Sequence, residues 1–101
     1  SRDHKHLVPY VGIDEKSIGR HHHYSSVLFD LQGQRVLDVV ESRDEVAAIR
    51  LLNKGLTGEE RTGVQAIAMD FWRPYLKAAR EILPQADVVN DPFHMIQQLN
   101  K

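Results

Sequence analysis

The spacing of hydrophobic positions near the start of the chain predicts three strands joined by short turns. Leu7 to Ile13 is an apolar run with Pro9 near its beginning, where a missing backbone N–H is tolerated. The stretch "HHHYSSVLFDL", residues 21–31, is rich in strand-forming residues, Gly33 supplies a turn, and "VLDVVE", residues 36–41, follows. Strands connected by such short polar loops favour an antiparallel meander.

After residue 41 the spacing of apolar residues changes to that of a helix. Ser42 lies three residues before Glu45, which is a capping-box pattern, and apolar residues recur at helical spacing until Gly55. Thr57 and Glu60 repeat the capping pattern, which predicts a second, short helix or turn.

The second half of the chain alternates between strand and helix. The run "VQAIAMD", residues 64–70, is almost wholly apolar and predicts a strand buried on both faces of a sheet. A helix is expected to start near Pro74 and to end at Pro84, and "ADVV", residues 86–89, predicts a fifth strand. Asp91 followed by Pro92 predicts the start of a last helix, whose apolar stripe consists of Phe93, Ile96 and Leu99.

The resulting order, β-β-β-α-β-α-β-α, predicts an α/β fold in one domain over residues 1–101. A meander followed by alternating helix and strand favours one mixed sheet with parallel strands in its second part. Functional sites in such sheets gather at the carboxyl ends of adjacent parallel strands. Asp14 and Asp70 each follow an apolar run, so both are expected at a strand end.

These two acids are the strongest candidates for chemistry. If the first and fourth strands are parallel neighbours, Asp14 and Asp70 face each other across about 4.8 Å. Facing carboxylates repel unless a cation lies between them, and oxygen ligands without cysteine favour Mg²⁺ or Mn²⁺. Two such ions serve phosphodiester chemistry in many enzymes. The simpler alternative is that these acids only mark the entries of exposed loops.

Five further residues are weaker candidates for a supporting or DNA-contacting role. Alternation along a strand turns Glu15 away from a site that Asp14 faces, unless the strand has already ended there. Lys16 and Arg73 could hold a phosphate, although solvation and a surface salt bridge are the commoner fates. Asp91 is most simply a helix N-cap and His94 a packing residue, but both follow the fifth strand and could border the same end of the sheet.

Histidines and aromatic residues near these acids leave two interpretations open. His21 and His23 share one face of the second strand, which allows transition-metal binding, but polar residues at a strand entry are the preferred reading of His21, His22 and His23. Phe71 and Trp72 are interpreted as core or rim residues, and an aromatic ring beside a catalytic acid could also stack on a base.

Composition narrows the class of protein. The chain has 101 residues, of which 42% are hydrophobic and 27% charged, which suits one soluble domain. It has no cysteine, which excludes disulfides and thiolate zinc sites from this stretch. A net charge of −1 is unlike that of a self-sufficient DNA-binding domain, so a nucleic-acid role requires metal ions or a basic partner region. No membrane span or signal peptide is recognisable, and we expect a cytoplasmic protein; the resemblance described next implies in addition that it is nucleoid-associated.

Three stretches together resemble the catalytic domain of DDE transposases from bacterial insertion sequences, in the branch called ISL3. They are "GIDEKSIGR", "VLDVVESRDEVA" and "AIAMDFWRPYLKAAREILPQADVVNDPFHMIQQLN", and the resemblance runs from about Val11 onward. It implies an RNase H-like fold, a two-Mg²⁺ reaction on DNA, and Asp14 and Asp70 as the first two acids of the catalytic triad. The third, a glutamate on a later helix, would lie beyond Lys101, and a DNA-binding region would precede this chain.

The resemblance therefore implies that this chain is an inactive fragment of an active transposase. The parent would cut one DNA strand at the ends of an insertion sequence, and the freed 3′-hydroxyl would attack target DNA. Its partners would be these DNAs and further copies of itself assembled on them. The alternatives are a different RNase H-like nuclease or resolvase, and a non-catalytic module derived from a transposase.

Overall fold

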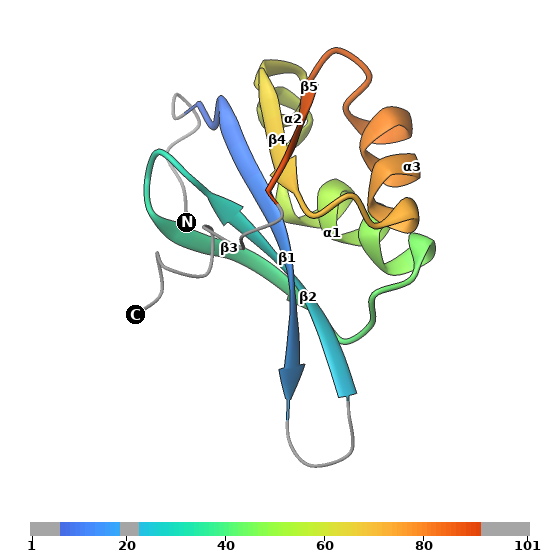
Figure 1. Ribbon diagram of the computed structural model, residues 1–101. Helices are drawn as coiled ribbons and strands as arrows, with labels where there is room; N and C mark the ends of the chain where they lie inside the picture. Colours follow the sequence, from blue (N-terminus) through green and yellow to red (C-terminus); the bar gives the residue numbers. More distant parts are fainter. Residues whose placement is uncertain (1–6, 19–22, 92–101) are drawn as a thin grey trace.

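Residues 7–18 and 23–91, the part of the chain that the computed structural model describes, form one mixed sheet and three helices (Figure 1). The elements are β1 (Tyr10–Ile18), β2 (His23–Asp30), β3 (Arg35–Val40), α1 (Glu45–Gly55), α2 (Gly58–Gly63), β4 (Ala66–Met69), α3 (Arg73–Ile82) and β5 (Asp87–Asn90). The sheet has five strands in the order β3-β2-β1-β4-β5.

The strand directions confirm the expected mixed sheet. β2 is antiparallel to both β1 and β3, while β4 runs parallel to β1 and β5 runs parallel to β4. The meander thus builds one half of the sheet, and the crossover connections through helices add β4 and β5 on the other side of β1. The predicted turn after β2 is also present, because the Asp30 side chain accepts a hydrogen bond from the Gly33 N–H at 2.9 Å.

The first strand is longer than predicted, and the expectation that Asp14 stands at its end was wrong. β1 continues to Ile18 because β2 pairs with it in antiparallel register along the whole stretch, as far as Ile18 opposite His23. Its parallel pairing with β4 covers only Tyr10 to Gly12. Asp14 is therefore inside β1, two residues beyond the point where β4 ceases to pair with it.

The capping of the first helix also differs from the prediction. Asp44, and not Ser42, is the N-cap of α1, because its side chain accepts a hydrogen bond from the Ala47 N–H at 2.8 Å. The Ser42 hydroxyl instead accepts from the Asp44 N–H at 3.3 Å. The second capping box, Thr57 with Glu60, is confirmed in both of its hydrogen bonds and begins α2, which the predicted element order had left out.

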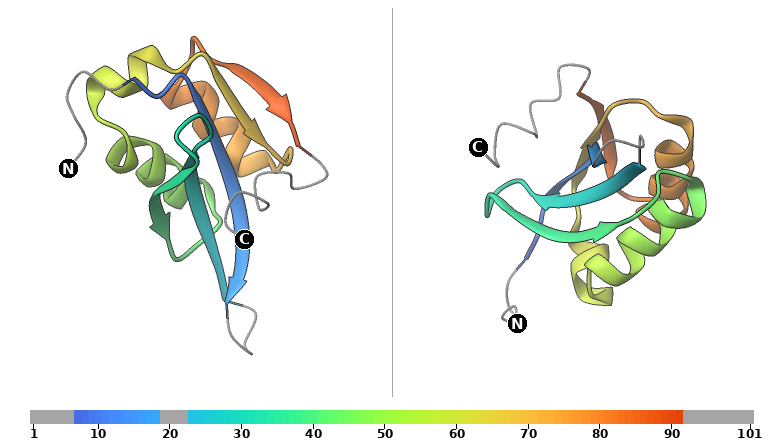
Figure 2. Two further views of the ribbon diagram at one scale, coloured as in Figure 1. Left: turned by 90° about the vertical axis from the view of Figure 1, so that its left-hand side faces the viewer. Right: turned by 90° about the horizontal axis from the view of Figure 1, so that it is seen from below.

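The core lies between the sheet and the helices on one of its faces (Figures 1 and 2). Residues 11 and 13 of β1 and 67 and 69 of β4 point into this core. The large side chains that are almost fully buried include Ile13, Leu28, Leu51, Leu52, Ile67, Met69, Tyr75 and Leu83. By alternation, Gly12 and Asp14 of β1 and Ala66 and Ala68 of β4 belong to the opposite face.

The predicted last helix, with Pro92 and His94, lies outside the described residues, as do His21 and His22. Asp91 is the last residue of the described part. Within residues 7–18 and 23–91, no helix has the length and apolar character that a membrane crossing requires.

Candidate active site

The register of the sheet aligns Asp14 with Asp70. Tyr10 pairs with Ala66 and Gly12 with Ala68, an offset of 56 positions. Extending the same offset by two residues sets Asp14 opposite Asp70 (14 + 56 = 70). Asp14, inside β1, and Asp70, directly after β4, thus both lie just beyond the residues that pair the two strands.

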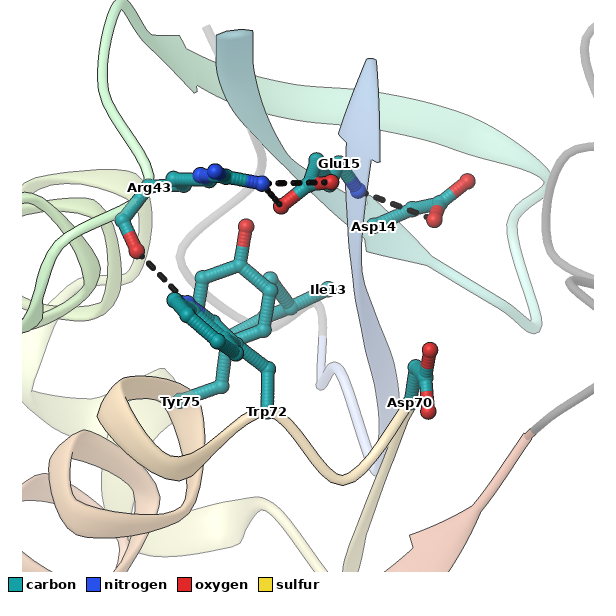
Figure 3. A pocket seen from close by; sticks show the side chains of 7 residues that line it. All are labelled: Ile13, Asp14, Glu15, Arg43, Asp70, Trp72 and Tyr75. Atoms are coloured by element: carbon teal, nitrogen blue, oxygen red, sulfur yellow. Dashed lines mark hydrogen bonds and ion pairs between the residues drawn. The ribbon is translucent and has the colours of Figure 1, made fainter.

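Both carboxylates point to the same side of β1 (Figure 3). Asp14 is only 4% exposed, and its Oδ1 accepts a hydrogen bond from the Glu15 N–H at 2.9 Å. Asp70 is exposed and directly follows β4. Its backbone carbonyl accepts from the Trp72 N–H at 2.5 Å, which closes a tight three-residue turn. One carboxylate is therefore fixed by a strand and the other by a turn.

Asp91 extends this row of acids to the third parallel strand. β4 and β5 pair with an offset of 21 positions, from Ala66 opposite Asp87 to Met69 opposite Asn90, which sets Asp91 beside Asp70 (70 + 21 = 91). The Asp91 N–H donates to the Met69 carbonyl at 2.7 Å, and Asp91 is buried. Asp91 thus borders the same end of the sheet as Asp70.

Glu15 points away from the two aspartates, as alternation predicts (Figure 3). Its carboxylate pairs with Arg43, with the Arg43 Nη1 at 3.3 Å from Oε1 and 3.4 Å from Oε2. Lys16 is half-buried, and its place in β1 puts it on the Asp14 face of the sheet. Arg73 is exposed in the first turn of α3, and His23 is exposed at the start of β2.

Arg43 is a residue whose importance the sequence did not reveal. Its guanidinium carbon lies 4.0 Å from the centre of the Tyr24 ring and 5.4 Å from that of Trp72. Its backbone carbonyl accepts a hydrogen bond from the Trp72 indole N–H at 2.8 Å. Together with Asp14, Asp70, Glu15 and Tyr75 it lines a pocket of about 110 Å³. These pocket residues come from separate parts of the chain and meet only in the folded structure. The sequence around Arg43 therefore predicted nothing more than the start of a helix.

Tyr75 anchors the segment that carries Arg43. The Ser26 hydroxyl donates its hydrogen to the Ser42 carbonyl at 2.6 Å. The Tyr75 hydroxyl lies 2.6 Å from the Ser26 Oγ and is therefore the donor in that second hydrogen bond. Burial raises the pKa of Tyr75 from 10.0 to about 12. This relay connects α3 to β2 and to the loop before α1.

The donor set fits a hard divalent cation. Aspartate oxygens on adjacent strands, facing the same side, are the ligand type that Mg²⁺ and Mn²⁺ prefer. Among residues 7–18 and 23–91, no group of three or more histidine, cysteine or acidic side chains is arranged to hold a metal. Within this part of the chain, Asp14 and Asp70 supply two carboxylates on one side of β1, and a cation held there would need further ligands.

Comparison with known proteins identifies the family and the fold. Residues 11–101 match the family model of ISL3-type DDE transposases, which is described as "Transposase". The transposase for insertion sequence element IS1001 of Bordetella parapertussis is 27% identical over 94 residues, which are 93% of this chain. The catalytic core domain of BIV integrase superposes with a TM-score of 0.57 at 11% identity, over 92% of this chain and 62% of that one.

The integrase likeness shows the fold, which is RNase H-like as expected. This chain spans 23% of the length of the IS1001 transposase, so it corresponds to a limited part of that relative.

Proposed function

Because this chain belongs to the ISL3 family of DDE transposases, we propose that it carries two of the catalytic carboxylates of a DNA transposase. The reaction would be metal-dependent DNA strand cleavage followed by strand transfer at the ends of an insertion sequence. The observation that supports this best is the position of Asp14 and Asp70 just beyond the paired part of β1 and β4, with both carboxylates on one side of β1.

Asp14 and Asp70 would hold Mg²⁺ or Mn²⁺, two ions in the complete protein. When bound, these ions would activate the attacking oxygen and offset negative charge on the phosphate. The protein's part is to hold the carboxylates in place before DNA arrives, since catalysis of this kind depends on positioning and electrostatics. The hydrogen bond from the Glu15 N–H and the tight turn at Asp70 supply that positioning.

Three other residues would support the site. Lys16 shares the face of Asp14 and carries a positive charge suited to a DNA phosphate. Asp91, beside Asp70, would orient ligands or water at the same end of the sheet, and Arg73 at the start of α3 would contact the DNA backbone. We further propose that a third carboxylate from beyond Lys101, a separate DNA-binding region and further protein copies complete the active assembly on DNA.

The proposed reaction has two steps. The cleavage step consumes one water molecule, and the strand-transfer step forms one phosphodiester bond for each one that it breaks. Water attacks the phosphate at the element's end, and the 3′-oxygen of that strand leaves with a proton. This 3′-hydroxyl then attacks a target phosphodiester in line, forming a new P–O bond as the target's own 3′-oxygen leaves.

Cleavage of DNA that carries the element's ends, measured with the complete transposase and Mg²⁺, tests this proposal. Asp14→Asn and Asp70→Ala should each reduce the cleavage rate on the order of a hundredfold or more, since each removes a direct ligand. Asp87→Asn is the matched control, because Asp87 begins β5 at the opposite end of the parallel strands. Cleavage that survives Asp70→Ala at the control rate would contradict the proposal.

A further inference from the structure

Two aromatic residues directly follow Asp70 and remain largely exposed. Phe71 is 50% exposed and Trp72 is 41% exposed. Trp72 is the single tryptophan of the chain. The proposed role of Asp14 and Asp70 leaves these rings without a function, although they adjoin the proposed site.

Trp72 is held more firmly than an exposed side chain usually is. Its backbone N–H donates to the Asp70 carbonyl at 2.5 Å, and its backbone carbonyl accepts from Tyr75 and Leu76 at the start of α3. Its indole N–H donates to the Arg43 carbonyl at 2.8 Å. Hydrogen bonds thus restrain both the backbone and the ring of Trp72 in the segment that directly follows Asp70.

The partly exposed side chain of Arg43 contacts this ring. Its guanidinium group lies between Tyr24 and Trp72 and is paired with Glu15. The pairing balances the charge of Arg43, which suits a supporting role better than capture of a DNA phosphate. Tyr75 fixes the loop beneath it through Ser26.

The end of β4 opens a route between the two sides of the sheet. β4 stops pairing with β1 after Gly12, so the edge of β1 at Asp14 and Glu15 is not covered by β4. The pocket at this edge is lined by Asp14 and Asp70 as well as by Arg43 and Trp72 (Figure 3). A DNA strand crossing this edge can place a phosphate near the carboxylates and its base near Trp72.

We propose that Trp72 is a stacking platform for one unstacked nucleobase of the DNA strand whose phosphate lies at Asp14 and Asp70. This inference rests on the proposed function. An aromatic face accepts every base, so the platform would recognise the unstacked state of a nucleotide and not its sequence. It would fix the strand beside the scissile phosphate, which makes Trp72 a substrate-positioning residue.

The test uses two single-stranded probes of about twelve nucleotides, a size in the range that single-strand sites accommodate. One is oligothymidylate and the other has the same phosphates but lacks bases. Oligothymidylate should quench the fluorescence of Trp72 and the abasic chain should not. Absence of quenching by oligothymidylate at saturating concentration would overturn the inference.

Variants make the same comparison by affinity, measured from the anisotropy of labelled probes. Trp72→Ala should weaken binding of oligothymidylate by about 5-fold to 100-fold and leave the abasic chain unaffected. Trp72→Phe, which keeps an aromatic face, should retain most of the affinity. Phe71→Ala is the matched control and should have less than about a twofold effect, because the ring of Phe71 has no hydrogen-bonding group to fix it. Equal losses on both probes, or an equal loss for Phe71→Ala, would overturn the inference.

Failure here is distinguishable from failure of the proposed function. Mn²⁺ binding at Asp14 and Asp70 without a base-dependent effect of Trp72 would reject the platform alone. Absence of Mn²⁺ binding at the two aspartates would reject the metal site, whatever Trp72 binds.

Discussion

At the scale of single residues, the adjacent acids Asp14 and Glu15 have separate environments. Alternation along β1 turns Asp14 to the side of the strand on which Asp70 lies and Glu15 toward Arg43. The Asp14 carboxylate therefore shares one side of β1 with that of Asp70, and the Glu15 carboxylate is paired with the Arg43 guanidinium on the other. Two adjacent acids of a strand can therefore differ in role, because their side chains lie on opposite faces of the sheet.

Glu15→Gln should disrupt the ion pair with Arg43 at little cost. Both side chains are partly exposed, at 32% and 43%, so we expect the free energy of unfolding in urea to fall by less than about 1 kcal/mol. Affinity for Mn²⁺ should remain unchanged. A loss of Mn²⁺ binding as large as that of Asp14→Asn would show that Glu15 belongs to the metal site.

Tyr75 should make stability depend on alkaline pH. Its folded-state pKa of about 12 exceeds its ordinary value of 10.0, so the folded state keeps a proton that the unfolded state releases. Its contribution is full below about pH 10 and is lost as pH rises toward 12, a loss of roughly 2–3 kcal/mol at most.

The measurement is urea unfolding of the wild type and Tyr75→Phe at about pH 9 and about pH 11. Below pH 10 the variant should be less stable by about 1 kcal/mol, because the hydrogen bond to Ser26 is lost. This difference should shrink or reverse at the higher pH. A difference that does not vary with pH would contradict the assignment.

At the scale of elements, the sequence pattern predicted those strands and helix ends that depend on interactions between residues close in the sequence. The strand runs, the Thr57–Glu60 capping box and the helix start near Pro74 depend on neighbouring residues, and the structure contains each of them. The extension of β1 through Asp14 and Glu15 depends on pairing with β2, which the run of polar residues concealed. The cluster around Arg43 depends on three separate elements and was not predictable from spacing.

Gly55 should be required for the packing of α1 on the sheet. A Cβ atom there would lie 2.7 Å from the Leu28 Cδ2 and 3.2 Å from the Asp38 Cβ, and Leu28 is fully buried. Gly55→Ala should therefore destabilise the fold by about 1–3 kcal/mol in urea unfolding. Gly58→Ala is the control, since its Cβ would meet only Arg61 at 3.6 Å. Equal effects of the two substitutions would contradict this packing argument.

At the scale of the whole molecule, the candidate site lies where two kinds of sheet meet. The antiparallel half continues along β1 and β2 beyond the end of β4, while the parallel half stops at Met69 (Figure 1). This difference in length leaves the edge of β1 at Asp14 without pairing to β4, although Asp14 itself is only 4% exposed. The register of the paired part, Tyr10 to Gly12 with Ala66 to Ala68, leaves Asp14 and Asp70 at the same distance along the chain beyond it.

Hydrogen exchange should follow this architecture. Amides of β1 at Val11 to Ile13, between neighbouring strands, should exchange only through global unfolding. Amides of β3 and β5, the outermost strands of the described sheet, should exchange faster through local opening. Equal protection of β5 and β1 in native-state exchange would contradict this gradient.

The central claim is that Asp14 and Asp70 jointly bind a divalent cation, and a Mn²⁺ titration followed by NMR tests it most directly. Signals around both aspartates should broaden together, and either Asp14→Asn or Asp70→Asn should abolish most of the broadening at both positions. Affinity should be weak, because two carboxylates leave much of the coordination sphere to water. Broadening that is confined to His23 and its surroundings, or that persists in both variants, would contradict the claim.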